Sequence, residues 1–266
     1  MSAVKLRLCI LLHLTLFVAP AAQAYDLWRN QPRLMLWAWE MPCDMRFVDN
    51  RSTGIAYLAG IITLENEKVI TKPRTQTLKF SPGTYKMAVV RVELSRRTGA
   101  SLSDVQLAEL VHQVQRLAFA GNVEAIQIDF DARQSERLFY KRFLAELRRA
   151  LPSSMPLSIT ALSSWCLRDV WIKQLDCDEV VPMFFSMGRA RNEALEALSS
   201  DGQQSLARLP MQESLGLSVN DSAVLKKFSS MTKHIYLFSR SGWNHGSAVK
   251  WVKSFEDGES GWKRLL

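Results

Sequence analysis

Apolar segments rich in β-forming residues recur along this chain and predict a series of buried strands. Amphipathic patterns with helix-start signals separate the later segments and predict helices between them. Ser103 and Ser135 are the expected N-caps of the first two helices, and Leu138 is expected on the buried face of the second. The eight predicted strands cover residues 34–40, 54–61, 85–94, 123–131, 157–165, 179–185, 215–219 and 234–240. The predicted helices cover residues 103–117, 135–147, 189–198, 222–231 and 247–255.

This alternation of strands and helices indicates a parallel sheet with right-handed crossovers. Eight strands favour closure into a (β/α)₈ barrel, the TIM barrel, because an open sheet would be expected to carry a glycine-rich nucleotide-binding turn that this chain lacks. The first two units are expected to be irregular. Residues 41–53 leave little room for a helix, and residues 62–72 look extended, with a hairpin turn at 65–67. We therefore predict an α/β fold with one barrel over residues 33–256.

The first 24 residues have the pattern of a secretory signal peptide. Lys5 and Arg7 are followed by an apolar run at 8–19 and by the cleavage motif Ala22-Gln23-Ala24. The run is shorter than the ~20 residues that a membrane-spanning helix needs. We expect residues 25–266 to form a single exported domain, periplasmic or secreted, with no integral membrane segment after cleavage.

The net charge of the chain is +8, and without Lys5 and Arg7 it is +6. Basic pairs are spread over separate predicted elements and alternate with acidic residues, as on solvated helix faces. A nucleic-acid partner would require a basic stripe with interleaved aromatic residues. We therefore expect no nucleic-acid partner.

Three cysteines remain after the predicted cleavage: Cys43, Cys166 and Cys177. An odd number leaves at least one thiol that is free or bridged to another chain. Cys43 and Cys166 both follow predicted strands, so a disulfide between them is one alternative and three buried thiols are the other. The histidines show no metal-binding spacing, and we expect neither a metal nor a cofactor.

Residues 123–132 combine a buried strand with acidic residues at its end. Strand geometry places Gln127, Asp129 and Asp131 on one face. Two carboxylates about 7 Å apart on one face are costly beside a core unless they are paired or functional. Their repulsion raises one pKa, a pattern that is common at functional sites. The C-terminal ends of barrel strands are also where active sites are built.

Other predicted strand ends bring carboxylates, arginines and tryptophans to the same rim. The candidate catalytic residues are Asp131, Asp129, Glu40 and Glu93. The candidate ligand contacts are Trp39, Arg91, Gln127, Trp165, Arg240 and Trp243. Aromatic rings cover the apolar face of a sugar, and carboxylates supply the acid and base that cleave glycosidic bonds. The alternative is structural: a buried ion-pair layer, with Arg91 paired to Glu93 or Asp129, and tryptophans packed beneath helices.

As a whole, the chain resembles an exported bacterial family known only as a domain of unknown function. The resemblance rests on four blocks, LWAWE at 36–40, QIDFDA at 127–132, SITALSSWC at 158–166 and DEVVPM at 178–183. It implies a glycoside-hydrolase-like barrel without an assigned reaction.

The fourth predicted strand is also similar to the chitinase-type signature D-x-x-D-x-D-x-E. The resemblance implies that Asp131 is the general acid and that Asp129 orients the acetamido group of the substrate. Gln127 replaces an acid of the signature, and Asp131 is one methylene shorter than its glutamate. The sixth strand ends in MFFS at 183–186 where the family has M-x-Y-D, so a hydroxyl and a carboxylate are missing. Trp243 fits the usual sugar-floor tryptophan. The pattern implies a relative of the chitinases rather than a chitinase.

Three hypotheses follow. The first is an exported glycoside hydrolase acting on a cell-envelope or extracellular polysaccharide. In it Asp131 protonates the leaving oxygen, Asp129 holds its proton or positions the sugar, and Glu40 or Glu93 is the base or nucleophile. A carboxyl separation of about 5–5.5 Å would imply retention and about 6.5–9.5 Å inversion. The second is a carbohydrate-binding barrel without catalysis. The third is an envelope scaffold or assembly protein, which would show an exposed apolar patch.

Overall fold

The computed structural model describes residues 31–50, 52–167, 170–185, 187, 214–221 and 234–256 of the 266-residue chain. All eight predicted strands lie within these ranges. The predicted signal peptide and the predicted helices at 189–198 and 222–231 lie outside the described residues.

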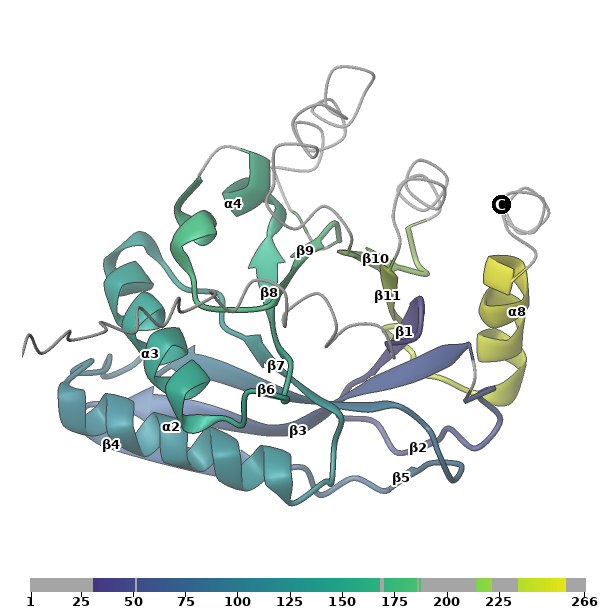
Figure 1. The fold of residues 1–266 in the computed structure, drawn as a ribbon, viewed down its shortest axis with the longest axis horizontal. Helices are drawn as coiled ribbons and strands as arrows, with labels where there is room; N and C mark the ends of the chain where they lie inside the picture. Colours follow the sequence, from purple (N-terminus) through teal and green to yellow (C-terminus); the bar gives the residue numbers. More distant parts are fainter. Residues whose placement is uncertain are drawn as a thin grey trace, which may run out of the picture.

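Eight parallel strands close into a barrel (Figure 1). Each pairs with the next along the chain, and the first closes the ring by pairing with both the second and the last. The strands are β1 (Leu34–Ala38), β3 (Thr53–Glu65), β6 (Lys86–Leu94), β7 (Ala125–Asp129), β8 (Leu157–Leu162), β9 (Glu179–Met183), β10 (Ser214–Ser218) and β11 (His234–Phe238). The predicted strands and the predicted α/β barrel are thereby confirmed.

The first two units depart from the regular repeat, as the sequence predicted. β2 (Cys43–Asp44) and β5 (Leu78–Lys79) form a separate two-stranded sheet, and β4 (Lys68–Pro73) adds to β3 in antiparallel orientation. Asn66 makes the β3–β4 turn with a φ of 48°, a left-handed conformation that asparagine tolerates. No described residue between β1 and β6 is helical.

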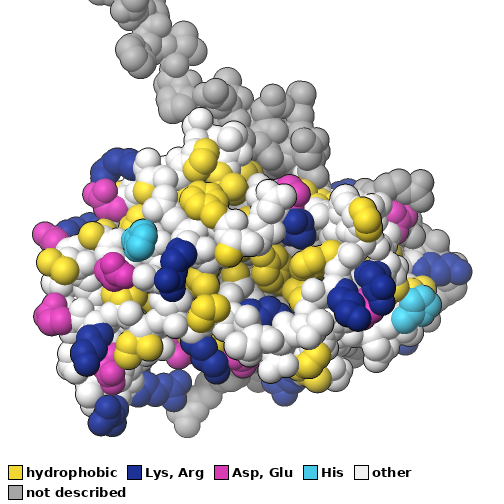
Figure 2. All heavy atoms as spheres, turned by 90° about the horizontal axis from the view of Figure 1, so that it is seen from below, with side chains coloured by type: hydrophobic (Ala, Val, Ile, Leu, Met, Phe, Trp, Pro, Cys, Tyr) yellow, Lys and Arg dark blue, Asp and Glu magenta, His cyan; other side chains and the backbone are white. Residues whose placement is uncertain are grey.

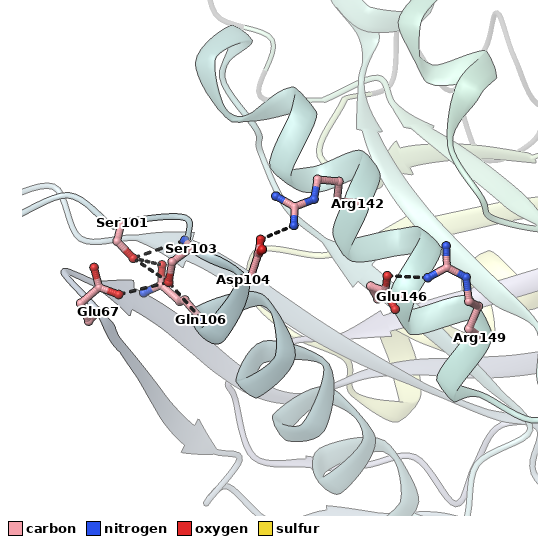
Figure 3. A network of polar contacts seen from close by, with 8 residues as sticks. All are labelled: Glu67, Ser101, Ser103, Asp104, Gln106, Arg142, Glu146 and Arg149. Carbon is pink, nitrogen blue, oxygen red and sulfur yellow. Dashed lines mark hydrogen bonds and ion pairs between the residues drawn. The ribbon is translucent and has the colours of Figure 1, made fainter.

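Helix α2 (Asp104–Phe119) packs over β3, β4 and β6. Ser103 caps it as predicted, because its hydroxyl accepts the backbone N–H of Gln106. The buried Gln106 side chain donates to the carbonyls of Asn66 and Lys68 and so ties the start of the helix to the β3–β4 turn. Figure 3 shows this cluster of polar side chains at the helix start.

Helix α3 (Arg137–Ala150) lies beside α2, and an ion pair between Arg142 and Asp104 links them (Figure 3). The prediction that Ser135 caps this helix is wrong. Ser135 lies in the 3₁₀ turn η1 (Gln134–Glu136), where the Glu136 carboxylate accepts the backbone N–H of Arg133. Leu138 is 72% exposed rather than buried. At 100° per residue it lies opposite the buried face, which is centred on Phe143 and Leu147.

The remaining described helical segments are α4 (Ser163–Leu167), η2 (Val170–Gln174) and α8 (His245–Glu256). α8 confirms the helix predicted at 247–255. Within the described residues, every helix is too short or too polar to span a bilayer. On the face shown in Figure 2, basic side chains are scattered among acidic ones rather than gathered in a stripe.

The strands divide the apolar residues into an outer core beneath the helices and an inner core inside the barrel. On β7 the alternation follows the prediction: Ile126 and Ile128 belong to the outer core, while Gln127 and Asp129 contact residues inside the barrel. Cys43, Cys166 and Cys177 are all free. The disulfide alternative is therefore wrong, and of the three thiols Cys43 and Cys166 are buried as expected while Cys177 is partly exposed.

Candidate functional site

A cavity of about 400 Å³ lies at the C-terminal end of the barrel, where parallel barrels carry their active sites. We call it the mouth cavity. Its volume lies within the range typical of small-molecule sites. It is lined by Trp37, Trp39, Arg91, Asp129, Asp131, Thr160, Leu162, Ser163, Ser164, Met183, Phe185, Met187 and Phe238.

One side of the mouth cavity holds a carboxylate with both oxygens engaged. Arg91 Nη1 donates to Asp129 Oδ2 at 2.7 Å, and the hydroxyl of Thr160 donates to Asp129 Oδ1 at 2.7 Å. Only 5% of the Asp129 side chain is exposed. Asp129 is therefore fixed by neighbours on the strands at either side of its own.

Asp131 lies two residues further on, just beyond the end of β7, and is held much less tightly. Its side chain is 44% exposed, and its Oδ2 lies 3.5 Å from Arg91 Nη2. The surrounding protein removes part of the hydration of the carboxyl and so raises its pKa. The negative charge of Asp129 raises the pKa further, and Arg91 opposes both effects. A carboxyl of raised pKa that a ligand can reach is suited to donate a proton.

Aromatic side chains form another part of the lining. Phe185, which follows β9, stacks on Phe238 of β11 with ring centroids 5.2 Å apart. Trp37 of β1 packs edge-on against Phe185 at 5.8 Å and is only 3% exposed, so it forms the floor of the cavity. In the ring of strands β11 stands opposite β7, which carries Asp129. A ligand here would contact apolar rings on one side and charged groups on the other.

Gly216 of β10 makes room for the ring of Trp37. A Cβ atom at this position would lie 2.6 Å from Trp37 Cη2 and 2.9 Å from Cζ3. The ring also lies 5.1 Å from Tyr236. The position of the cavity floor thus depends on a residue without a side chain.

A second cavity of about 180 Å³ adjoins the mouth cavity. Trp39 and Phe238 line both cavities and form the boundary between them. The smaller cavity is lined by Ala38, Trp39, Glu40, Met41, Cys43, Phe238, Ser239, Arg240, Gly242 and Trp243. The sequence predicted a single rim site, whereas Glu40, Arg240 and Trp243 lie in this neighbouring cavity. Trp243 is 6% exposed, and its Nε1 donates to the carbonyl of Trp37 at 2.8 Å.

Three predicted site residues line neither cavity. Glu93 lies at the exposed rim, with Oε2 3.7 Å from Arg91 Nε. Gln127 is fully buried. Trp165 is 5% exposed and packs edge-on against Trp171 at 5.0 Å. The predicted strand runs through Trp165, but β8 ends at residue 162 and α4 turns this side chain into the outer core.

The structural alternative expected Arg91 to pair with Glu93 or Asp129. Both pairs are present, but only Asp129 is buried, because the Glu93 side chain is 46% exposed. Within the described part of the chain, no group of three or more histidine, cysteine or acidic side chains is placed to hold a metal ion.

Sequence reasoning overlooked several lining residues. Trp37 shares strand parity with Trp39, so the prediction for Trp39 applied to it as well. Phe185 follows β9 and Phe238 ends β11. Both strands were predicted, but these two rings were not assigned to the site. Thr160 carries no distinctive signal, because threonine is enriched in strands generally.

Comparisons with known proteins found one family model and solved structures to which this chain is similar. Residues 83–179 match the model of a family described as a domain of unknown function, DUF3142. A protein provisionally assigned as Chitinase A from Streptomyces coelicolor has a similar crystal structure, with a TM-score of 0.61 and 11% identity over 85% of this chain and 97% of that one. A chitinase from Rhizomucor miehei gives a TM-score of 0.45 and 14% identity over 70% and 68%. No curated protein matches the chain. The Streptomyces coelicolor protein thus has a fold similar to the barrel of this chain.

Proposed function

We propose that this protein binds a segment of a polysaccharide in the mouth cavity and hydrolyses a glycosidic bond with Asp131 as the general acid. One observation carries the proposal: a ligand-accessible carboxyl of raised pKa lies in the same cavity as an aromatic wall. This combination suits a sugar ring, which has an apolar face and an acid-labile bond. The likeness of the fold to a protein assigned as a chitinase supports the same class of ligand.

The neighbours of Asp131 have distinct roles in this proposal. Asp129 is held by Arg91 and Thr160, and its negative charge favours the protonated form of Asp131. Asp131 passes its proton to the leaving oxygen, and water completes the hydrolysis. Glu93 at the rim and Glu40 in the adjoining cavity are the candidates for the base or nucleophile.

The proposed ligand is a cell-envelope or extracellular polysaccharide, and the proposed location is the periplasm or the exterior of the cell. The signal-peptide pattern of residues 1–24 supports both. Trp39 is the ring best placed to contact a chain longer than one sugar, because it borders both cavities.

A second candidate function is saccharide binding without catalysis. One observation favours it: among the described lining residues of the mouth cavity, only Asp129 and Asp131 are acidic, and Arg91 contacts both. A hydrolase with a separate base or nucleophile would need Glu40 or Glu93 for that role, and neither of them lines the mouth cavity.

A panel of envelope and exopolysaccharide oligosaccharides separates these candidates. Binding is measured by tryptophan emission and cleavage by new reducing ends, for the wild type, Asp131→Asn and the control Asp104→Asn, which alters a surface carboxylate of α2. The hydrolase proposal predicts that Asp131→Asn binds but cleaves about 100-fold more slowly or worse, while Asp104→Asn behaves as the wild type. Binding without cleavage by the wild type favours the second candidate. A panel that neither binds nor is cleaved overturns both.

A further inference from the structure

A second buried carboxylate lies inside the barrel, below the mouth cavity. Glu179 is the first residue of β9 and is 5% exposed. It accepts hydrogen bonds from the hydroxyls of Ser158 at 2.6 Å, Ser214 at 2.5 Å and Tyr236 at 2.7 Å. No cation among the described residues pairs with it; hydroxyl groups alone satisfy this carboxylate.

A chain of hydrogen bonds connects Glu179 to the floor of the mouth cavity, and all its donors point toward Glu179. The Ser158 hydroxyl donates its single proton to Glu179 Oε2. The Ser158 oxygen then accepts from Gln127 Nε2 at 3.0 Å. This orients the Gln127 amide so that its Oε1 accepts from Trp37 Nε1 at 2.8 Å. The indole N–H of Trp37 can only donate, and each group along the chain donates to the next until Glu179.

Trp37, at the end of this chain, connects it to the aromatic wall. Its ring forms the cavity floor and supports Phe185, which in turn stacks on Phe238. A rotation of the Trp37 ring would therefore displace both phenylalanines. Gly216 bounds the ring on one side but provides no hydrogen bond to fix its rotation.

We infer that Glu179 is a positioning residue: through Ser158 and Gln127 it fixes the ring of Trp37 and thereby the aromatic wall that contacts the saccharide. The claim that the aromatic wall contacts a saccharide rests on the proposed function, whereas the claim that Glu179 fixes the Trp37 ring does not. Neither Glu179 nor Trp37 touches the reacting groups in this assignment.

Two serines provide a matched pair of variants. Ser158 and Ser214 are both buried and both donate to Glu179, but only Ser158 lies on the path to Trp37. Ser158→Ala and Ser214→Ala each remove one hydroxyl bond to the same carboxylate. A purely structural role for Glu179 predicts similar consequences for the two variants.

The first readout is the indole N–H resonance of Trp37 in ¹⁵N-labelled protein, assigned by its loss in Trp37→Phe. We expect Ser158→Ala to shift this resonance and to accelerate its hydrogen exchange at least tenfold, while Ser214→Ala leaves both within twofold of the wild type. Equal behaviour of the two variants, with or without a change, overturns the inference. This readout needs no ligand, so it decides the role of Glu179 even if the proposed function fails.

The second readout is affinity for the N-acetylglucosamine hexamer and for cellohexaose, measured by tryptophan emission. For a probe that the wild type binds, Ser158→Ala should weaken affinity about fivefold, as expected for one misplaced aromatic contact, and Ser214→Ala less than twofold. If the wild type binds neither probe, the saccharide part falls together with the proposed function. Equal affinities in both variants overturn the saccharide part alone.

Glu179→Gln and Glu179→Met test the carboxylate itself. A glutamine can turn its oxygen toward Ser158 and Tyr236 and donate to the Ser214 hydroxyl oxygen, which can also accept, so the indole resonance should stay close to that of the wild type. Methionine fills the same space without accepting and should reproduce the effect of Ser158→Ala. A Trp37 resonance that is unchanged in Glu179→Met overturns the inference.

Discussion

Asp129 at the mouth of the barrel and Glu179 in its interior are both almost fully buried carboxylates on inward-facing strand positions, yet their partners differ. Asp129 is paired with the cation Arg91 and with one hydroxyl. Glu179 has three hydroxyl partners and no cation among the described residues. Around Glu179 every hydrogen bond ends on another buried group. Around Asp129 the network leads to Asp131, which is 44% exposed.

The two carboxylates show that the rigid hydrogen-bond network and the proposed reactive carboxyl lie in different parts of the barrel. In the interior, a fully satisfied network fixes side chains in one arrangement. At the mouth, Arg91 is shared among three carboxylates, and the 3.5 Å contact with Asp131 is loose enough for a ligand to replace it. The chemistry that we propose therefore takes place at the mouth, where the contact of Asp131 with its cation is weak.

The largest effect is expected from Arg91→Met. The variant leaves Asp129 buried without its cation, which should lower the free energy of unfolding by about 3 kcal/mol, the low end of the range for a broken buried pair. The low end applies because Arg91 is itself 32% exposed. Urea denaturation at pH 7 measures this change. Arg97→Met, which removes an exposed pair with Glu65, should cost less than about 1 kcal/mol, and equal losses in the two variants would contradict the role of Arg91.

Gly216→Ala should have the next largest effect. Its Cβ would overlap the Trp37 ring at 2.6 Å, and the overpacking should cost about 2 kcal/mol of unfolding free energy. The control is Gly246→Ala in α8, where the added Cβ would meet only the Asn244 side chain at 3.7 Å. Thermal denaturation of the two variants compares them. A Gly216→Ala protein as stable as Gly246→Ala would show that the floor of the cavity can move freely.

Trp39→Ala should weaken saccharide affinity about fivefold, because it removes one aromatic contact worth about 1 kcal/mol. Trp165→Ala provides the contrast: this ring is buried against Trp171, so its loss should lower stability and leave affinity unchanged. Titration of tryptophan emission with a bound oligosaccharide measures the first effect, and denaturation measures the second. A loss of affinity in Trp165→Ala alone would show that the ligand binds elsewhere.

Asp131→Asn should have the smallest effect on stability. The folded protein raises the pKa of Asp131, so the folded state binds its proton more tightly than the unfolded state. Stability therefore falls as pH rises through the interval between the two pKa values, and the ionised carboxyl destabilises the protein above it. Because the group is well exposed, the variant should be more stable at pH 7 by no more than about 0.5 kcal/mol. The gain should vanish below about pH 3, where the carboxyl is protonated in both states.

The sequence was sufficient to predict the strands because each one contains a short run of apolar or β-forming residues, even where polar residues alternate with them, as in β7. It was also sufficient for the placement of Asp129, because alternation along β7 is regular. The boundaries at helix starts were less predictable. Glu136, rather than Ser135, is the N-cap residue of α3, and its carboxylate accepts the backbone N–H of Arg133 in the preceding turn η1 instead of capping the helix.

The division of the rim into two cavities could not be predicted. Strand parity shows which residues face inward, but not that Trp39 and Phe238 form a boundary between Glu40 and Asp131. Glu179 is a different case, because a signal was present. It shares parity with Val181, a residue of the inner core, so a buried carboxylate inside the barrel could have been inferred.

The most direct test of the account is the titration of the Asp131 side-chain carboxyl by ¹³C NMR, with the resonance assigned through Asp131→Asn. We expect Asp131 to titrate clearly above the ~3.9 of an unperturbed aspartate, and Asp129→Asn to lower this pKa by removing the neighbouring charge. A pKa of Asp131 at or below the unperturbed value would contradict its assignment as the acid of the mouth cavity.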